Sequence, residues 1–479
     1  MFHLADLANA IPHALLLGDG GTRWEHISLD SRTIKSGELF IALKGENYDG
    51  HIFIEEAYEK GAVGAVLERS YFQKHQSTLK KLEKPLLIVD NTLLAFQLWA
   101  HHYYSLFRPF TICVTGSNGK TTTKEMIAHL LSSRYRVLKS EGNYNNEIGV
   151  PLTILKLAPE HEVLILEMAA QKTGEIKELA QIVSPDLVVV TNIGEAHIGL
   201  FGNKVNITRE KAELLLALRE KGTAILNRDD SCYSKLLNYV SQSNEVISFG
   251  FNPEAEIRAG DFRQKNEGEL YFELIVPNKG KYRVLLPLMG KFNISNALAA
   301  LATGIRMKIP LSDLIGSLAN FEGADLHMQP LLLHKGITLI QDYYNANPTA
   351  AKEALLCVAS IASDRFKVAV LGDMLELGEY SAGYHKEIGS LTAALCYDLL
   401  ITIGDYGKFI RQGAREEEMA EQKIHHFDKQ EKDRLADHLT ELVPNNSIVL
   451  LKGSRSMHME DIVQFWQANI KGKESVGHA

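Results

Sequence analysis

The stretch Thr115–Met126, TGSNGKTTTKEM, decides how the middle of this chain folds. It follows the apolar run FTICVT and leads into a segment whose apolar residues recur at helical spacing. The usual phosphate-loop pattern has four residues between its first glycine and the Gly-Lys pair, whereas only two separate Gly116 from Gly119. A glycine turn between a strand and a helix still directs backbone N–H groups at an anion. The context therefore predicts a phosphate loop of another type rather than a chance turn.

The loop carries the groups that a nucleotide needs. The amine of Lys120 can reach the outer phosphates, and the hydroxyl of Thr121 can bind magnesium. The predicted nucleotide-binding residues of the loop are Gly116, Ser117, Asn118, Gly119, Lys120, Thr121 and Thr122.

Length and composition bound the class of protein. At 479 residues the chain is too long for one core, and a prior of ~150 residues per domain suggests about three domains. A net charge of -8 argues against a broad nucleic-acid surface, which needs clustered Lys and Arg. The start lacks a basic leader, no uncharged apolar run approaches the ~20 residues of a membrane span, and four scattered cysteines fit reduced thiols. We therefore expect a cytoplasmic protein without a membrane span.

Three regions differ in pattern, and together they predict an α/β protein of three domains. Residues 1–106 contain short strands and helices, typical of a small α/β domain. Residues 107–326 repeat strand, loop and helix around continuous apolar runs, as in a P-loop ATPase-like parallel sheet, and 249–287 alternates like an antiparallel extension. Residues 327–479 restart the alternation and predict a C-terminal Rossmann-like sheet.

Two polar residues follow apolar strands of the central region. Glu167 ends the run VLILE, where a parallel sheet presents ligand-facing groups, so we predict that it holds a metal. His197 follows the next strand in TNIGEAHIG; a lone histidine in that place is either structural or a ligand.

Lys211 shares a predicted helical face with Leu214, Leu215 and Leu218. An amine on an apolar face loses hydration, so its pKa falls, and a neutral amine can react with carbon dioxide to form an anionic, metal-binding carbamate. The alternative is a lysine that extends along the apolar surface to reach water.

Amides and a carboxylate elsewhere suit the nucleoside. Asn293 and Asn296 lie one helical turn apart, so that both can face a purine, although Asn293 can equally cap the helix. Asp342 follows the strand ITLIQ and can accept hydrogen bonds from ribose hydroxyls.

In combination these motifs resemble the Mur ligase family, in the family's order and over nearly the whole chain. The stretches that carry the resemblance are TGSNGKTTT, GNYNNEIGVPLT, LEM, the EKAEL lysine, KFNISNALAA and DYYNANP. LDSRTIKSGELFIALKGENYDGH, DYYNANPTAAKEAL, LGDMLELGEYSAGYH and KGSRSMHMEDIV resemble the member that joins D-Ala-D-Ala to UDP-N-acetylmuramoyl-tripeptide. The His-Thr-Pro-Asp run and Asp-Asn-Pro-Arg loop of the sister enzyme that adds the third residue are missing from the sequence.

The resemblance implies an ATP-dependent amide ligase that works through an acyl phosphate and yields the peptidoglycan pentapeptide precursor. It implies ATP at the loop, with Asn293 near adenine and Asp342 near ribose. It also implies two magnesium ions, one held by Thr121 and Glu167 and one by His197 and a carbamylated Lys211. Lys120, Lys211 and His197 are thus the expected catalytic residues, and a monomer is expected.

The resemblance further implies substrate-binding residues in the first and third domains. They are Ser31, Arg32, Lys44, Gly45, Asp49, His51, Asn345, Asn347 and Arg455. The alternative for the DSR and KG stretches of the first domain is that they are only turn residues without a role in binding.

The sequence departs from the family at two places. Phe292 stands where a histidine is common, and His327 stands where the family has an arginine that reaches the γ-phosphate. Histidine is shorter and mostly neutral at pH 7, so we expect Lys120, the metals or Arg455 to compensate. Rival interpretations are another Mur-type ligase, a folylpolyglutamate synthetase, and a nucleotide-gated scaffold. The DSR region speaks against the folate enzyme, and the joint presence of Glu167, His197 and Lys211 speaks against a scaffold.

Overall fold

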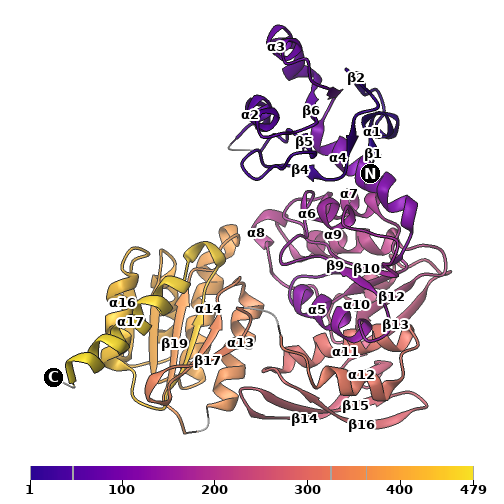
Figure 1. Cartoon of the computed structure of the whole chain (residues 1–479). Helices are drawn as coiled ribbons and strands as arrows, with labels where there is room; N and C mark the ends of the chain where they lie inside the picture. Colours follow the sequence, from indigo (N-terminus) through magenta and orange to yellow (C-terminus); the bar gives the residue numbers. More distant parts are fainter. Residues whose placement is uncertain (1, 46–47, 324–325, 363, 478–479) are drawn as a thin grey trace. The chain divides into compact units, whose positions relative to one another are not determined.

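The structure is a computed structural model that describes residues 2–45, 48–323, 326–362 and 364–477. The chain divides into two compact units. The first comprises Met1–Thr111, Ser140–Leu164 and Glu178–Ser184, and the second comprises Ile112–Lys139, Ile165–Lys177 and Pro185–Ala479. Each of the three α/β regions expected from the sequence has a principal sheet of its own (Figure 1). The boundaries at 106 and 326 stay predictions.

The N-terminal region is built on a five-stranded sheet with the order β2-β7-β6-β5-β4. Its strands are β2 (Leu15–Leu17), β4 (Ile27–Ser28), β5 (Leu39–Ile41), β6 (Gly64–Glu68) and β7 (Leu86–Val89). Only β2 runs antiparallel to its neighbour. A second, two-stranded sheet pairs β1 (Phe2–His3) with β3 (Arg23–Trp24). The helices are α1 (Leu4–Ala10), α2 (Ile54–Glu59), α3 (Arg69–Lys81) and α4 (Thr92–Phe107).

Apolar residues alternate between the two faces of this sheet, and each face has its own core. One core holds Leu39, Ile41 and Trp99 of α4, and the other holds Phe40 and Ala42. Because both faces are covered, the strands read as continuous apolar runs.

The central sheet has nine strands in the order β16-β15-β14-β13-β12-β11-β8-β10-β9. Its strands are β8 (Phe110–Thr115), β9 (Val137–Lys139), β10 (Val163–Glu167), β11 (Leu187–Val190), β12 (Thr223–Asn227), β13 (Glu245–Gly250), β14 (Ile257–Asn266), β15 (Glu269–Val276) and β16 (Gly280–Leu286). The strands β8, β11, β12 and β13 are parallel, whereas β14, β15 and β16 form an antiparallel meander. The antiparallel extension expected over 249–287 is therefore confirmed, and exposure alternates along β15 as a half-covered strand requires.

Two helices pack together beside the phosphate loop, α5 (Lys120–Leu131) and α11 (Lys291–Arg306). The apolar face predicted for α5 is confirmed, because Met126, Ile127 and Leu131 are buried. The remaining helices of this region are α6 (Gly149–Ile154), α7 (Glu175–Ile182), α8 (Ile198–Phe201), α9 (Lys204–Leu216), α10 (Tyr233–Leu237) and α12 (Leu311–Leu318).

The third sheet has six strands in the order β17-β18-β22-β19-β20-β21. The strands are β17 (Gln329–Leu332), β18 (Thr338–Asp342), β19 (Lys367–Gly372), β20 (Leu399–Ile403), β21 (Ile424–Phe427) and β22 (Ile448–Lys452). All pairings are parallel except that of β17 with β18. Because the chain returns from β21 to place β22 between β18 and β19, the sheet has a switch point at its carboxyl edge.

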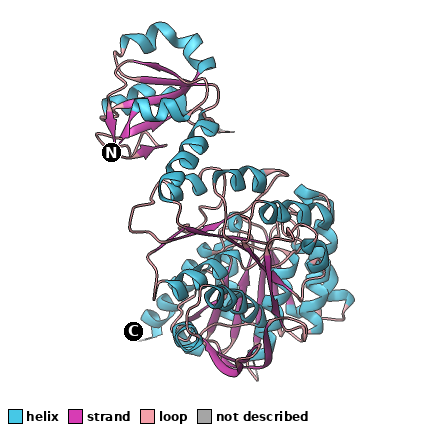
Figure 2. Cartoon of the chain, turned by 90° about the vertical axis from the view of Figure 1, so that its right-hand side faces the viewer, coloured by secondary structure: helices cyan, strands magenta, loops and turns pink. Residues whose placement is uncertain are grey.

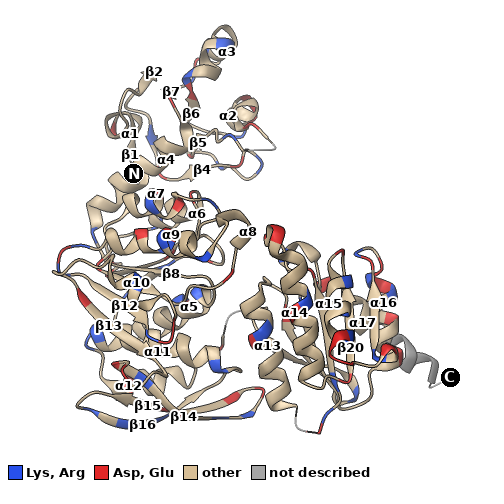
Figure 3. Cartoon of the chain, turned by 180° about the vertical axis from the view of Figure 1, so that it is seen from behind, with Lys and Arg blue, Asp and Glu red and all other residues tan. Residues whose placement is uncertain are grey.

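Helices lie on both faces of the third sheet (Figure 1), and the mixture of helices and strands extends through the described chain (Figure 2). The helices of the third sheet are α13 (Pro348–Ile361), α14 (Ser381–Ala394), α15 (Gly407–Glu416), α16 (Lys432–Leu442) and α17 (Glu460–Gly477). Basic and acidic residues are interspersed along these helices (Figure 3), and some pair between neighbouring helices, such as Lys432 with Asp461 at 2.6 Å. Among the residues that the structure describes, no helix has both the length and the apolar character needed to cross a membrane.

Candidate nucleotide and metal site

The phosphate loop lies between β8 and α5, as the sequence predicted. Gly116 and Gly119 both have positive φ, at 147° and 75°. A Cβ on Gly116 would lie 2.0 Å from Thr191 Oγ1, and one on Gly119 would lie 2.3 Å from Asn296 Oδ1. Glycine is therefore required at both positions by backbone conformation and by space.

The end of β11 supports the loop. Asn192 accepts hydrogen bonds from the backbone N–H groups of Ser117 and Asn118, both at 2.9 Å. The hydroxyl of Thr191 donates to the carbonyl oxygen of Asn118 at 2.6 Å. Sequence reasoning missed these supports, although the TN pair directly after an apolar strand was a usable signal.

Lys120 opens α5 and folds back over the loop, where its Nζ donates to the carbonyl oxygens of Gly116 and Ser117 at 3.0 Å. Burial lowers the pKa of Lys120, and the nearby carboxylate of Glu167 opposes that shift. The amine therefore lies at the loop, near enough to Glu167 for the two charges to interact.

Glu167 ends β10 and is buried, with 1% of its side chain exposed. The Nζ atom of Lys124 lies 3.7 Å from its Oε2 atom. A buried carboxylate is costly unless a cation or a metal compensates it. Its place at the carboxyl edge of the sheet agrees with the metal role predicted from the sequence.

Lys211 lies on α9 and is buried, and its pKa falls to about 7. Burial is the main cause and the charge of Lys120 adds to it, while Glu210 and Glu175 oppose the shift. A large neutral fraction at pH 7 suits carbamate formation, and the burial of the side chain argues against a lysine that extends along the surface to reach water. Leu214 and Leu215 share the buried side of this helix, but α9 ends at Leu216, so the expected helical position of Leu218 was wrong.

His197 precedes α8 with a left-handed backbone, at φ 61°, and its Nδ1 pairs with the carboxylate of Glu376. That hydrogen bond keeps the pKa of Glu376 below its usual range. The backbone N–H of Gly199 donates to the carbonyl oxygen of Glu376 at 3.0 Å. Glu376 was missed, because nothing in the sequence relates two loops 179 residues apart.

No three His, Cys, Asp or Glu side chains converge on a common point within the described ranges. The ligand sets expected from the sequence contain one such residue for each ion, Glu167 or His197, so they do not require such a cluster.

The two amides of α11 bond each other rather than a common outside partner. Asn296 Nδ2 donates to Asn293 Oδ1 at 3.0 Å, and Asn293 Nδ2 donates to the carbonyl oxygen of Met289 at 2.7 Å. The helix cap is Gly290, so the alternative that Asn293 caps the helix is wrong. Asn296 also accepts from the hydroxyl of Thr123 at 3.3 Å and thereby ties α11 to the loop helix.

Asp342 ends β18 and is buried beside Lys452, which ends the neighbouring strand β22. Lys452 Nζ lies 2.6 Å from Asp342 Oδ2 and donates to the carbonyl oxygen of Asn345 at 3.1 Å. Lys452 was missed, although a lysine that directly follows the apolar run IVLL fits the rule that identified Glu167.

Asn347 caps α13 by accepting a hydrogen bond from the backbone of Ala350 at 3.0 Å. Its Nδ2 atom also donates to Asn118 Oδ1 of the phosphate loop at 2.6 Å, within the second compact unit. Arg455 is more than half exposed and lies 3.1 Å from Glu460. The structure thus brings Asn347 to the phosphate loop, whereas Arg455 pairs with Glu460.

His327 is half-buried, and its ring centre lies 4.8 Å from that of Tyr344. Burial lowers its pKa, helped by Lys452 and Lys120 and opposed by Asp342 and Glu167. The ring is therefore mostly neutral at pH 7, as the sequence analysis assumed.

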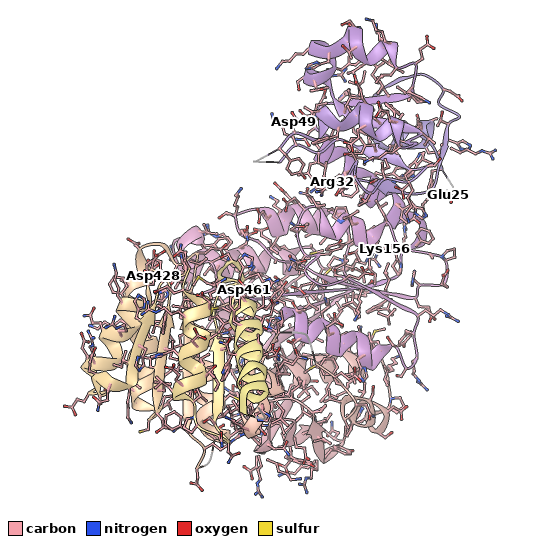
Figure 4. All side chains as sticks on the ribbon, turned by 60° about the vertical axis from the view of Figure 1, so that its left-hand side comes forward. Glu25, Arg32, Asp49, Lys156, Asp428 and Asp461 are labelled. Carbon is pink, nitrogen blue, oxygen red and sulfur yellow. The ribbon has the colours of Figure 1, made fainter. Side chains whose placement is uncertain are left out.

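The residues expected to bind substrate in the N-terminal region lie in two loops, which contain the labelled Arg32 and Asp49 (Figure 4). Arg32 is mostly exposed and pairs with Asp30 at 2.7 Å. Ser31 is buried and donates to Glu56 at 3.0 Å.

The second loop is fixed by His51 and by a bridge between Lys44 and Asp49. His51 is buried, and its Nδ1 contacts Asp49 at 2.5 Å while its Nε2 accepts from the backbone of Glu68 at 2.9 Å. Gly45 donates to the carbonyl oxygen of Tyr48 at 2.9 Å. Both ring nitrogens of His51 are therefore engaged within the domain.

Comparison with known families agrees with this arrangement. Residues 23–104 match the model of the Mur ligase family catalytic domain, 114–304 match the Mur ligase middle domain, and 328–455 match the Mur ligase glutamate ligase domain. The chain belongs to the Mur ligase family.

Within that family it is 34% identical to the UDP-N-acetylmuramoyl-tripeptide–D-alanyl-D-alanine ligase of Bacillus subtilis, over 91% of this chain and 92% of the relative. A crystal structure of MurF from Acinetobacter baumannii superimposes with a TM-score of 0.87 at 28% identity, covering 98% of this chain and 99% of that one. The MurF ligase of Thermotoga maritima in complex with ADP gives 0.82 at 27% identity, over 94% and 99% of the two chains. The three-domain α/β fold predicted from the sequence is thereby confirmed.

Proposed function

We propose that this chain is an ATP-dependent ligase that joins D-alanyl-D-alanine to UDP-N-acetylmuramoyl-tripeptide. The product is the pentapeptide precursor of peptidoglycan, made in the cytoplasm by a monomer. The glycine loop carries the proposal, because side chains are sterically excluded at Gly116 and Gly119 while Glu167 ends the adjacent strand. The identity of the two substrates follows from the relatives, which match over more than nine tenths of both chains.

The loop and α5 bind the nucleotide. Apart from those of Ser117 and Asn118, which Asn192 engages, the backbone N–H groups from Gly116 to Thr121 would face the phosphates. Lys120 would leave the carbonyl oxygens of Gly116 and Ser117 to neutralise phosphate charge. Asn293 would lie on the adenine side and Asp342 on the ribose side. Asn118 and Asn347 join the loop to the start of α13, so nucleotide binding is coupled to the third sheet.

Two magnesium ions fit the residues present. Thr121 and Glu167 would hold one, and His197 and a carbamylated Lys211 would hold the other. When bound, the ions offset the negative charge of the phosphates and the substrate carboxylate. A pKa of about 7 makes Lys211 chemically able to form the carbamate, and His197 would exchange Glu376 for the metal.

The reaction is amide ligation through an acyl phosphate on the tripeptide carboxylate. The tripeptide carboxylate takes the γ-phosphoryl group of ATP, and ADP leaves. The amine of the dipeptide then attacks the acyl carbon, phosphate leaves, and the amine gives up a proton to solvent. Lys120 would neutralise phosphate charge, Glu167 and a carbamylated Lys211 would hold the magnesium ions, and closure of the domains would position the reacting groups. The first domain would bind the uridine diphosphate sugar through Ser31, Arg32, Lys44, Gly45, Asp49 and His51.

Phosphate release tests the proposal. The protein is incubated with ATP, magnesium and UDP-N-acetylmuramoyl-tripeptide, carrying either diaminopimelate or lysine, with and without D-Ala-D-Ala. Single amino acids and folates serve as rival acceptors. Release that requires both the tripeptide and D-Ala-D-Ala is expected. Release that is indifferent to every amine would favour a nucleotide-gated scaffold, and release driven by a folate would favour the folate enzyme.

A further inference from the structure

Lys124 is a buried cation to which the proposed reaction assigns no role. It lies one helical turn after Lys120 on α5, and no part of its side chain is exposed. Its Nζ atom lies 3.1 Å from Glu125 Oε1 and 3.7 Å from Glu167 Oε2. Because it has no exposed surface, it cannot reach a nucleotide as Lys120 can. Its charge acts inside the protein.

Lys124 belongs to a chain of four alternating charges that connects the sheet edge to the metal site. Lys139 of β9 pairs with Glu125, Glu125 pairs with Lys124, and Lys124 lies beside Glu167. Glu125 is thus compensated from the other side by Lys139, which leaves the charge of Lys124 to compensate Glu167. A carboxylate and an ammonium buried together need such compensation, since either alone would cost several kcal/mol.

The distance between Lys124 Nζ and Glu167 Oε2 shows that Lys124 acts on Glu167 through its charge rather than through a short hydrogen bond to that oxygen. Charge-assisted N–H···O bonds measure about 2.7–2.9 Å, and 3.7 Å is longer. Lys124 therefore lowers the negative potential at Glu167 without the short contact that ties Lys452 to Asp342 at 2.6 Å. A divalent cation that approaches Glu167 therefore meets the positive charge of Lys124 behind the carboxylate, in addition to that of Lys120, whose pKa Glu167 affects.

We propose that Lys124 is a positioning residue whose charge neutralises Glu167 while no metal is bound. The site then takes a divalent cation together with the nucleotide phosphates rather than alone. This inference rests on the metal role given to Glu167 in the proposed function. The nucleotide supplies the negative charges that Lys124 cancels in the protein, so metal and nucleotide bind as one species.

The test is a gain of ion affinity, which a merely structural lysine would not give. Binding of Mn²⁺ alone to the full chain is measured by electron paramagnetic resonance at pH 8.0, without nucleotide. Lys124→Met should bind Mn²⁺ about tenfold or more tightly than the unaltered protein, because a positive charge near the site is lost. With a non-hydrolysable ATP analogue present, the two proteins should differ less. Unchanged or weaker binding of Mn²⁺ alone by folded Lys124→Met would overturn the inference.

Three further variants make the result specific. Lys124→Gln keeps a polar group without the charge and should shift affinity in the same direction, which covers the case that Lys124→Met fails to fold. Lys265→Met removes an exposed lysine that pairs with Glu269 at 2.7 Å, and should change nothing. In Glu167→Gln the gain from removing Lys124 should vanish. If Glu167→Gln leaves Mn²⁺ binding with the ATP analogue intact, the metal role of Glu167 itself is wrong, which is a separate failure.

Discussion

Glu167 and Asp342 are two carboxylates in the same structural position with different partners. Each ends a buried parallel strand after an apolar run, and each is almost fully buried beside a lysine. Asp342 forms a direct ion pair with Lys452 of the neighbouring strand at 2.6 Å, whereas Glu167 lies 3.7 Å from Lys124, which is closer to Glu125. The first arrangement holds its carboxylate in a direct ion pair, and the second leaves a carboxylate suited to a metal. Position in the fold alone therefore does not show which partner a carboxylate at a strand end takes.

The largest effect should come from breaking the Asp342–Lys452 pair. Asp342→Ala leaves Lys452 buried without its carboxylate, and we expect a loss of about 3–5 kcal/mol in the free energy of unfolding. Urea denaturation measures this loss. The double variant Asp342→Leu/Lys452→Met replaces the pair by apolar side chains and should recover most of it. Equal destabilisation by the single and double variants would contradict a buried ion pair.

Glu167→Gln should act on turnover instead. It keeps the shape of the side chain and removes the charge that the metal requires, so kcat should fall about 10²- to 10³-fold, comparable to losing one strong electrostatic contact in an active site. Steady-state phosphate release at several magnesium concentrations checks this, with the urea midpoint as a control. A fall in stability without a fall in kcat would mean that Glu167 is a structural acid and holds no metal.

The comparison also shows which parts of the site could be predicted from the sequence. The glycine loop, the three sheets and Glu167 were predictable because a strand, a turn and a helix are local patterns, and a carboxylate after four consecutive apolar residues is conspicuous. Lys452 follows the same rule and was overlooked. Glu376 and the mutual bond of Asn293 and Asn296 depend on contacts that only the folded chain creates, so no spacing could have indicated them.

Lys211 extends the comparison to a buried amine whose loss of hydration outweighs the opposing charges of Glu210 and Glu175. Its pKa in the folded protein, about 7, lies below the ordinary 10.5. Between these values the unfolded chain holds more protons than the folded one, so stability should rise with pH by up to ~1.4 kcal/mol per unit. Lys211→Met should lose this slope in urea unfolding at pH 7.5, 8.5 and 9.5 in buffers free of carbon dioxide. An unchanged slope would mean that another group titrates.

The carbamate has its own signature. Lys211→Ala should lose phosphate release, and added short carboxylic acids should restore part of it by supplying the missing anionic group. The matched control is Lys204→Ala on the same helix, whose amine is partly exposed and 3.9 Å from Glu195, and which should need no such rescue. If acids fail to rescue Lys211→Ala while mass spectrometry shows an unmodified lysine in the native protein, the carbamate is wrong.

The smallest effect concerns His327. The charges of both carboxylates of this comparison, Asp342 and Glu167, raise the pKa of its ring. Burial lowers the pKa of the ring most, and Lys452 and Lys120 lower it further, so the ring stays mostly neutral at pH 7. An arginine at position 327 would add a positive charge to a site where, in the proposed function, Lys120 already neutralises phosphate charge. We therefore expect His327→Arg to change kcat and the KM for ATP by no more than about twofold, equivalent to ~0.5 kcal/mol. His327→Gln, which is neutral and of similar length, is the matched control. A sharp rise in kcat for the arginine variant alone would mean that the site lacks a γ-phosphate cation that neither Lys120 nor Arg455 provides.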